Sequence, residues 1–110
     1  MRALLLLLLA GCSVINYSTR PEDFPGLKIT VHEYPSIAEV RQACDQAAQK
    51  YGQSISAFVV ACSEWRFDTL SCAVHVPVDS PELLEHERAH CQGYDHVGES
   101  TIADAWKAYR

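Results

Sequence analysis

The order of apolar and polar residues predicts a strand and then a helix in the first half of the chain. Residues 27–33 alternate between apolar and polar side chains, as in a strand with one buried face. A helix is predicted next, because Ser36 and Glu39 have the spacing of a capping box. Apolar residues then recur at helical spacing as far as Tyr51, and Gly52 can end the helix.

Two further strands are predicted in the second half of the chain. Residues 56–62 have strand-like apolar positions at Phe58, Val60 and Cys62, and residues 70–76 have them at alternate positions. The more polar residues 63–69 between these strands predict a loop. The two strands are therefore expected to form a hairpin.

Two helices are predicted after the hairpin. Ser80 and Pro81 suit the N-cap and first turn of a helix that runs to Gly93, and a short last helix begins at about Ser100. The predicted order is β-α-β-β-α-α. It indicates an α+β domain in which helices pack on a small antiparallel sheet.

Composition limits the classes of protein to which the chain can belong. Its 110 residues are 48% hydrophobic and 21% charged, which excludes a disordered tail and predicts one domain. The net charge is −5 and the sequence has no run of Lys or Arg, so we expect no nucleic-acid binding.

The beginning of the chain has the pattern of an export signal. One basic residue precedes an apolar run at residues 3–10, which is far shorter than the roughly 20 residues that span a bilayer. The next residues complete the motif Leu9-Ala10-Gly11-Cys12, which resembles the lipobox of bacterial lipoproteins. The alternative is that the apolar run belongs to the core of the domain.

The lipoprotein resemblance implies a division of the chain into three parts. Residues 1–11 are a signal peptide, residues 12–26 are a lipidated Cys12 with a tether, and residues 27–110 are the folded domain. The lipid on Cys12 would attach the protein to a membrane of the bacterial cell envelope. Ser13 after the cysteine favours the outer membrane, with the domain facing the periplasm.

The remaining cysteines are even in number, as expected for disulfides in an oxidising compartment. They are Cys44, Cys62, Cys72 and Cys91, and they allow three pairings. Cys62 and Cys72 lie symmetrically across the predicted hairpin, and the other two lie on inward faces of predicted helices. This placement favours the pairs Cys62–Cys72 and Cys44–Cys91.

The second long helix carries the pattern H-E-x-x-H-x-x-G-x-x-H. It is formed by His86, Glu87, His90, Gly93 and His96. A chance match to five fixed positions is expected in about one chain of this length in 10⁴. The pattern is therefore a strong indication of function.

The spacing of the histidines predicts one zinc site. His86 and His90 are one helical turn apart and lie about 40° apart on one face, so both imidazoles can bind the same Zn²⁺. Gly93 can reverse the chain, and His96 can then return as the third ligand. Three protein ligands leave a fourth position for water, as in catalytic zinc sites.

Glu87 is predicted to be the general base. It falls about 100° around the helix from His86, on the arc that also holds Leu83, Leu84 and Cys91. A buried carboxylate is unfavourable unless it has a partner, and a water molecule at a zinc ion supplies one.

The motif resembles that of the zinc metallopeptidases called zincins, and its eleven-residue form is similar to the metzincin motif. The resemblance implies that His86, His90 and His96 bind zinc, that Glu87 acts as general base and acid, and that Gly93 makes the turn. It also implies that residues 70–76 form the edge strand beside which a substrate lies, and that the first helix packs behind the sheet.

One part of the metzincin pattern is missing. Metzincins have a methionine turn below the metal, whereas the only methionine in this sequence is Met1. Trp106 or another apolar group would have to take its place, or the chain is a different minimal zincin.

We therefore expect a lipid-anchored, zinc-dependent peptidase that acts on a peptide or protein substrate. The alternative is a non-catalytic, zinc-binding and disulfide-stabilised lipoprotein of the envelope, which binds a protein partner or assists an assembly. A lipoprotein held by disulfides alone, without metal, is the third possibility.

Overall fold

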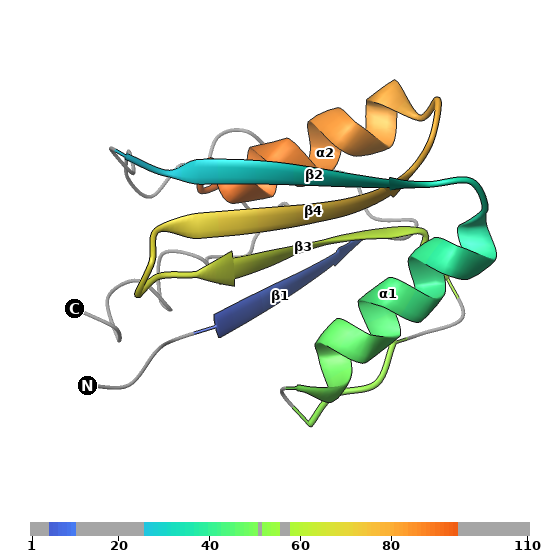
Figure 1. The fold of residues 1–110 in the computed structure, drawn as a ribbon, viewed down its shortest axis with the longest axis horizontal. Helices are drawn as coiled ribbons and strands as arrows, with labels where there is room; N and C mark the ends of the chain where they lie inside the picture. Colours follow the sequence, from blue (N-terminus) through green and yellow to red (C-terminus); the bar gives the residue numbers. More distant parts are fainter. Residues whose placement is uncertain (1–4, 11–25, 51, 56–57, 95–110) are drawn as a thin grey trace.

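The described part of the protein has a twisted mixed β-sheet with strand order β1-β3-β4-β2 and two helices (Figure 1). The computed structural model describes residues 5–10, 26–50, 52–55 and 58–94. Strand β3 is antiparallel to both β1 and β4, whereas β2 is parallel to β4. The elements are β1 (Leu5–Ala10), β2 (Lys28–Tyr34), α1 (Ile37–Gln49), β3 (Ala61–Arg66), β4 (Ser71–Pro77) and α2 (Pro81–Cys91).

Helix α1 begins and ends where the sequence predicts. The Ser36 hydroxyl oxygen accepts a hydrogen bond from the Glu39 N–H at 3.2 Å, and the hydroxyl donates to the Glu39 carboxylate at 3.2 Å. Gly52, with φ of 69°, reverses the chain after the helix. One face of α1 packs against the sheet through four buried residues, Val40, Cys44, Ala47 and Ala48.

The β3–β4 hairpin begins later in the chain than the sequence pattern indicates. The predicted strand at residues 56–62 and the loop at residues 63–69 are wrong, because β3 is Ala61–Arg66 and the turn covers only residues 67–70. The polar residues of β3 suggest a loop, but most positions of the strand are buried, Ser63 included, because both of its faces are covered.

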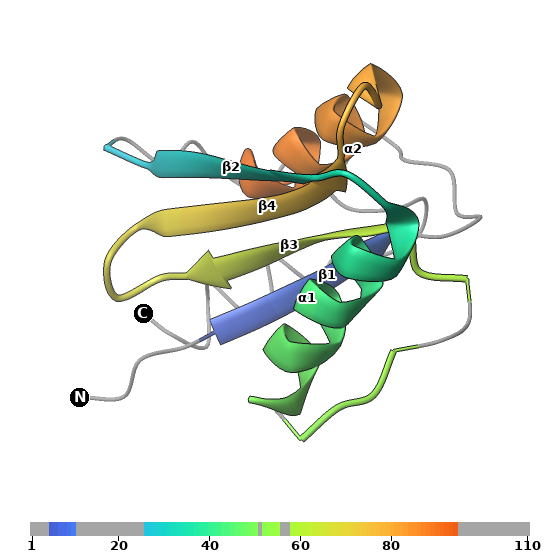
Figure 2. The same cartoon turned by 45° about the vertical axis from the view of Figure 1, so that its right-hand side comes forward.

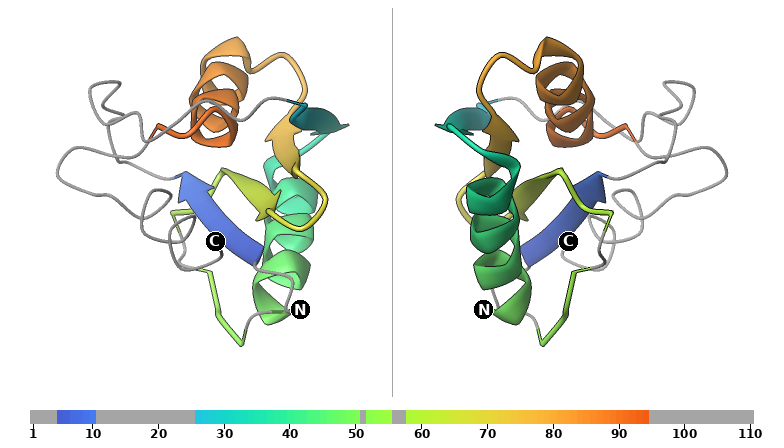
Figure 3. Two further views of the ribbon diagram at one scale, coloured as in Figure 1. Left: turned by 90° about the vertical axis from the view of Figure 1, so that its left-hand side faces the viewer. Right: turned by 90° about the vertical axis from the view of Figure 1, so that its right-hand side faces the viewer.

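The two helices cover opposite faces of the sheet (Figures 2 and 3). Cys62 of β3 faces α1 and packs in a cluster with Val40 and Val59. Trp65 of β3 and Val74 of β4 belong to the other cluster, which packs against α2. Since successive side chains of a strand point to opposite faces, the hairpin supplies both layers of the core.

The two disulfides each join one helix to the face of the sheet that it covers. Cys44 of α1 pairs with Cys62 of β3, and Cys72 of β4 pairs with Cys91 of α2. All four cysteines are thus in disulfides, as expected, but the favoured pairs Cys62–Cys72 and Cys44–Cys91 are wrong. In the actual register Cys72 lies opposite Trp65 rather than Cys62, so the two hairpin cysteines face opposite sides of the sheet.

The α+β class and the order β-α-β-β-α are confirmed, and the sheet is mixed rather than wholly antiparallel. The expectation that residues 70–76 form an edge strand is wrong, because β4 lies between β3 and β2. Helix α1 covers the face opposite α2, as the zincin resemblance implies. The last predicted helix, from about Ser100, lies outside the described residues.

Strand β1 comes from the apolar run that the sequence assigns to a signal peptide. Its backbone pairs with β3 from Leu5 opposite Arg66 to Ala10 opposite Ala61. Removal of residues 1–11 would therefore leave a three-stranded sheet and expose the edge of β3. Cys12 lies outside the described residues. Neither helix of the described part is long and apolar enough to cross a membrane.

Candidate metal centre

Helix α2 carries the first part of the motif and lies on the face of the sheet formed by the hairpin. Pro81 is in its first turn, where a missing N–H costs nothing. Ser80 is the N-cap residue, but its hydroxyl donates to the Val78 carbonyl at 3.3 Å rather than capping the helix. Leu83 and Leu84 pack against the core on this face, which fixes the rotation of the helix about its axis.

The imidazoles of His86 and His90 lie beside each other on α2. Their ring centroids are 5.0 Å apart, and the rings meet edge to face at 75°. His86 is partly exposed, with 15% of its side chain accessible, whereas His90 is fully buried. One imidazole of the pair therefore faces solvent and the other faces the core.

A main-chain contact selects the tautomer of His90. Its Nδ1 lies 2.8 Å from the Tyr94 carbonyl oxygen, which can only accept a hydrogen bond. The proton is therefore on Nδ1, and the lone pair of the neutral ring is on Nε2. Metal-binding histidines commonly have this arrangement, in which a carbonyl holds one nitrogen and the other nitrogen binds the ion.

The end of α2 reverses the chain at Gly93. Gly93 has φ of 100°, and its N–H donates to the His90 carbonyl at 3.1 Å. The Tyr94 N–H reaches back to the Ala89 carbonyl at 3.0 Å, which completes a Schellman motif. This geometry turns the chain back after the helix. His96, the remaining histidine of the motif, lies outside the described residues.

Two contacts fasten the last turn of α2 to the sheet. The buried Trp65 indole N–H donates to the His90 carbonyl oxygen at 3.0 Å. The next residue, Cys91, is bonded to Cys72 of β4 with a Cα–Cα distance of 5.7 Å. The main chain of α2 is therefore attached to the sheet at two consecutive residues, His90 and Cys91.

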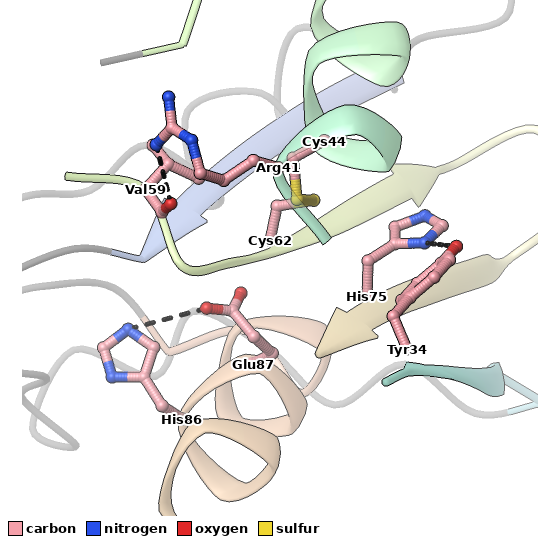
Figure 4. The surroundings of a disulfide bond; sticks show 8 residues. All are labelled: Tyr34, Arg41, Cys44, Val59, Cys62, His75, His86 and Glu87. Atoms are coloured by element: carbon pink, nitrogen blue, oxygen red, sulfur yellow. Dashed lines mark hydrogen bonds and ion pairs between the residues drawn. A yellow bond between two sulfur atoms is a disulfide. The ribbon is translucent and has the colours of Figure 1, made fainter. Parts of the chain in front are cut away.

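Glu87 is fully buried on α2, and neither of its carboxylate oxygens has a hydrogen-bond partner among the described residues. Figure 4 shows the Glu87 carboxylate beside the His86 imidazole, to which it is joined by an ion-pair contact. The Oε2 atom of Glu87 lies 4.0 Å from Nε2 of His86. Burial raises the pKa of the Glu87 carboxyl from 4.5 to about 8, and the Ser63 hydroxyl opposes this effect. A carboxyl group in this position has the basicity to accept a proton near neutral pH.

The donor set next to Glu87 fits a zinc ion. No group of three or more His, Cys, Asp or Glu side chains in the described part of the chain is arranged to hold a metal, so a site there needs a ligand from elsewhere. His86 and His90 supply two borderline-soft nitrogen donors on one helix face, which suit Zn²⁺. The buried carboxylate beside them lacks the partner that a water molecule at such an ion would provide.

Two histidines outside the motif lie on the other face of the sheet. His32 of β2 and His75 of β4 stack with ring centroids 5.1 Å apart, and the Tyr34 hydroxyl is 2.9 Å from Nδ1 of His75 (Figure 4). Burial, followed by the charge of His32, lowers the pKa of His75. These residues face α1, so the sheet separates them from the motif.

The sequence pattern did not assign Ser63 and Trp65 to the site. Both residues fall in the segment predicted as a loop, whereas β3 places them on the face toward α2. The alternation of Ser63, Trp65 and Phe67 with charged residues was the available signal, because it has the period of a strand.

Comparison with known proteins gives no further assignment, since no protein-family model, no curated protein and no solved structure matches the chain.

Proposed function

We propose that the protein is a zinc-dependent peptidase of the bacterial cell envelope. The observation that carries the proposal is the fully buried carboxylate of Glu87, which has no hydrogen bond among the described residues and lies on the same helix as the neighbouring imidazoles of His86 and His90. A buried carboxylate without a hydrogen bond destabilises a fold by several kcal/mol, and a zinc-bound water molecule would supply the missing partner. Its place in the pattern with Gly93 and His96 supports a hydrolytic site.

His86, His90 and His96 would hold the zinc through neutral imidazole nitrogens. When bound, Zn²⁺ supplies Lewis-acid polarisation of the scissile carbonyl, lowers the pKa of water and favours the ionised form of the neighbouring carboxyl. Glu87 takes a proton from the attacking water and then gives it to the leaving amide nitrogen. The Tyr94 carbonyl keeps the proton of His90 on Nδ1 throughout.

The proposal includes attachment to the membrane. The signal peptide at residues 1–11 would be removed, and acyl chains on Cys12 would anchor the domain through the tether at residues 12–26. The lipobox pattern and Ser13 support an outer-membrane location that faces the periplasm. The two disulfides suit that oxidising compartment.

Glu87→Gln tests the catalytic part of the proposal. This variant should bind one equivalent of zinc like the wild type but should lose at least about 10³-fold in the rate of hydrolysis of a fluorescence-quenched peptide library. Glu85→Gln is the matched control, because Glu85 is an exposed carboxylate two residues earlier on the same helix, and its rate should be unchanged.

Two results would contradict the peptidase proposal. One is a zinc-loaded wild type that cleaves no member of the library, which would favour the non-catalytic, zinc-binding lipoprotein. The other is a Glu87→Gln variant that retains the wild-type rate.

A further inference from the structure

The edge strand β1 lies wholly within the segment that the lipobox assigns to removal. β1 ends at Ala10, and the proposed cleavage site follows Gly11. Processing would therefore take away one complete strand of the sheet and no part of the other elements. The precursor, which keeps residues 1–11, thus differs from the processed protein at one edge of the sheet.

β1 fills the outer edge of β3 along the whole length of that strand (Figure 1). The β3 residues on the face toward α2 are fully buried while β1 is in place, namely Ala61, Ser63 and Trp65. Without β1, the outer N–H and C=O groups of β3 would lose their partners in the sheet. An open edge of this kind accepts an extended chain as an added strand.

This edge adjoins the helix that carries the motif. Helix α2 lies against β1 as well as against β3 and β4. The register places Leu6 of β1 opposite Trp65, whose indole N–H donates to the His90 carbonyl at 3.0 Å. A chain in the place of β1 therefore lies against α2 and next to the strand that holds His90.

We propose that β1 blocks the precursor by occupying the place where an extended peptide adds to β3 as an antiparallel strand, and that removal of residues 1–11 opens this place. The leader strand Leu5–Ala10 shows that an apolar chain of six residues fits the edge. A tethered strand excludes a free peptide, because its effective concentration is on the order of millimolar.

The opening step is a hydrolysis by a signal peptidase. It breaks the Gly11–Cys12 peptide bond, consumes one water molecule, and leaves a carboxylate on Gly11 and an amine on Cys12. The inference rests on the proposed function for its consequence in catalysis, but not for the binding of a peptide.

Peptide binding tests the blocked edge without catalysis. Three zinc-free proteins with both disulfides intact are compared in the same detergent: the processed wild type, the precursor kept by Cys12→Ser, and this precursor with Leu7→Pro and Leu8→Pro. Successive residues of an antiparallel strand alternate in their bonding to the partner strand, so one of the two prolines removes a hydrogen bond to β3. The probe is a fluorescent peptide with the sequence of residues 5–10 between pairs of lysines.

The processed protein and the proline variant should bind the probe at least about tenfold more tightly than the precursor does, as measured by fluorescence anisotropy. A probe with proline at its two central positions should bind to none of them. Ala3→Pro with Leu4→Pro is the matched control variant, because these residues precede β1, and it should bind like the precursor. Equal binding of the probe by the processed protein and the precursor would overturn the inference, and so would binding by neither.

A second form of the precursor removes any dependence on the folding of these proteins. A site-specific protease sequence replaces residues 14–20, and the chain is cut after it has folded and formed its disulfides. Probe binding should appear after the cut, because β1 is then no longer tethered. A cut chain that has released residues 1–13 and still binds no probe would count against the open edge.

Turnover tests the consequence for the proposed peptidase. The zinc-loaded precursor should hydrolyse the fluorescence-quenched peptide library at least about tenfold more slowly than the processed protein, and the Leu7→Pro, Leu8→Pro variant should recover most of the processed rate. The zinc Kd should be the same in all three, since β1 consists of leucine and alanine and supplies no ligand. A precursor as active as the processed protein would contradict the blocking role of β1.

The two tests separate the inference from the proposed function. Probe binding that is blocked only in the precursor, in a processed protein that cleaves no peptide, would support the strand site and contradict the peptidase. A precursor and a processed protein that bind the probe equally and cleave peptides at one rate would contradict the inference alone.

Discussion

Raising the pH should destabilise the zinc-free protein through one residue, Glu87. Below pH 4.5 its carboxyl is protonated in both the folded and the unfolded chain, so it adds no pH dependence. Between pH 4.5 and about 8 the unfolded chain releases this proton and the folded chain keeps it, because burial raises the folded-state pKa to about 8. The free energy of unfolding should therefore fall as the pH rises through this interval.

The magnitude follows from the two pKa values. One pH unit corresponds to about 1.4 kcal/mol, so the loss accumulates to about 5 kcal/mol and levels off above pH 8. This amount is comparable to the whole stability of many small domains. The zinc-free protein should consequently be most stable in mildly acidic solution, as far as this one group is concerned.

The assay compares the wild type with Glu87→Gln, which cannot ionise. Urea unfolding is measured from pH 4 to pH 9 in a chelator with both disulfides intact, and the difference between the two proteins is plotted against pH. That difference cancels the other titrating groups and should rise in favour of Glu87→Gln by several kcal/mol. Glu85→Gln should give a flat difference, because the Glu85 carboxylate is exposed in the folded chain.

A flat plot for Glu87→Gln, or a wild type that gains stability relative to it as the pH rises, would refute the reasoning. Either result would mean that Glu87 is solvated or paired in the folded protein. The burial on which the proposed role of this carboxylate depends would then be wrong.

Three further predictions follow from the same geometry. Trp65→Phe keeps an aromatic ring but removes the N–H that donates to the His90 carbonyl of α2. A competition assay with a zinc chelator should therefore show about tenfold weaker zinc binding, and an unchanged zinc Kd would contradict this prediction. Loss of the Cys72–Cys91 disulfide should weaken zinc binding about 10–100-fold. Loss of Cys44–Cys62, which has nearly the same sequence separation, should lower the free energy of unfolding by about 2–4 kcal/mol, as loss of Cys72–Cys91 does, but should leave zinc binding unchanged. Equal zinc affinities of the two disulfide variants would contradict this prediction. Chelation of zinc should lower the melting temperature of the wild type by more than about 10 °C, and an unchanged melting temperature would argue against a metal in the folded state.

The sequence was sufficient to predict α1 and α2 because their signals are local. The capping box of Ser36 and Glu39 and the turn at Gly52 are formed as the spacing predicts. Pro81 and Gly93 likewise bound the helix that carries the motif. These features depend on residues that are near each other in the chain.

Features that depend on pairing between distant segments could not be predicted in the same way. The disulfide pairs follow from the register of the hairpin, in which Cys62 lies opposite His75 and Cys72 lies opposite Trp65. Strand β3 was displaced in the prediction because helices cover both of its faces, which removes the simple alternation of buried and exposed residues. The parallel pairing of β2 with β4 has no signal in either strand alone.

The motif itself was the most informative part of the site. Its residues in α2 predicted that the imidazoles of His86 and His90 lie beside each other and that Glu87 faces inward, and the structure has both features. The contribution of Ser63 and Trp65 required the tertiary structure, because these residues come from another strand. The place of His96 lies outside the described residues and stays a prediction.

X-ray absorption at the zinc edge tests the central claim most directly, together with the zinc content of the full chain and of His96→Ala. The account predicts one zinc per chain, bound by three imidazole nitrogens at about 2.0–2.1 Å and one further light atom. His96→Ala should lose one imidazole from the spectrum and most of its affinity. A wild type that retains no zinc after dialysis, or a spectrum that is unchanged in His96→Ala, would contradict the account.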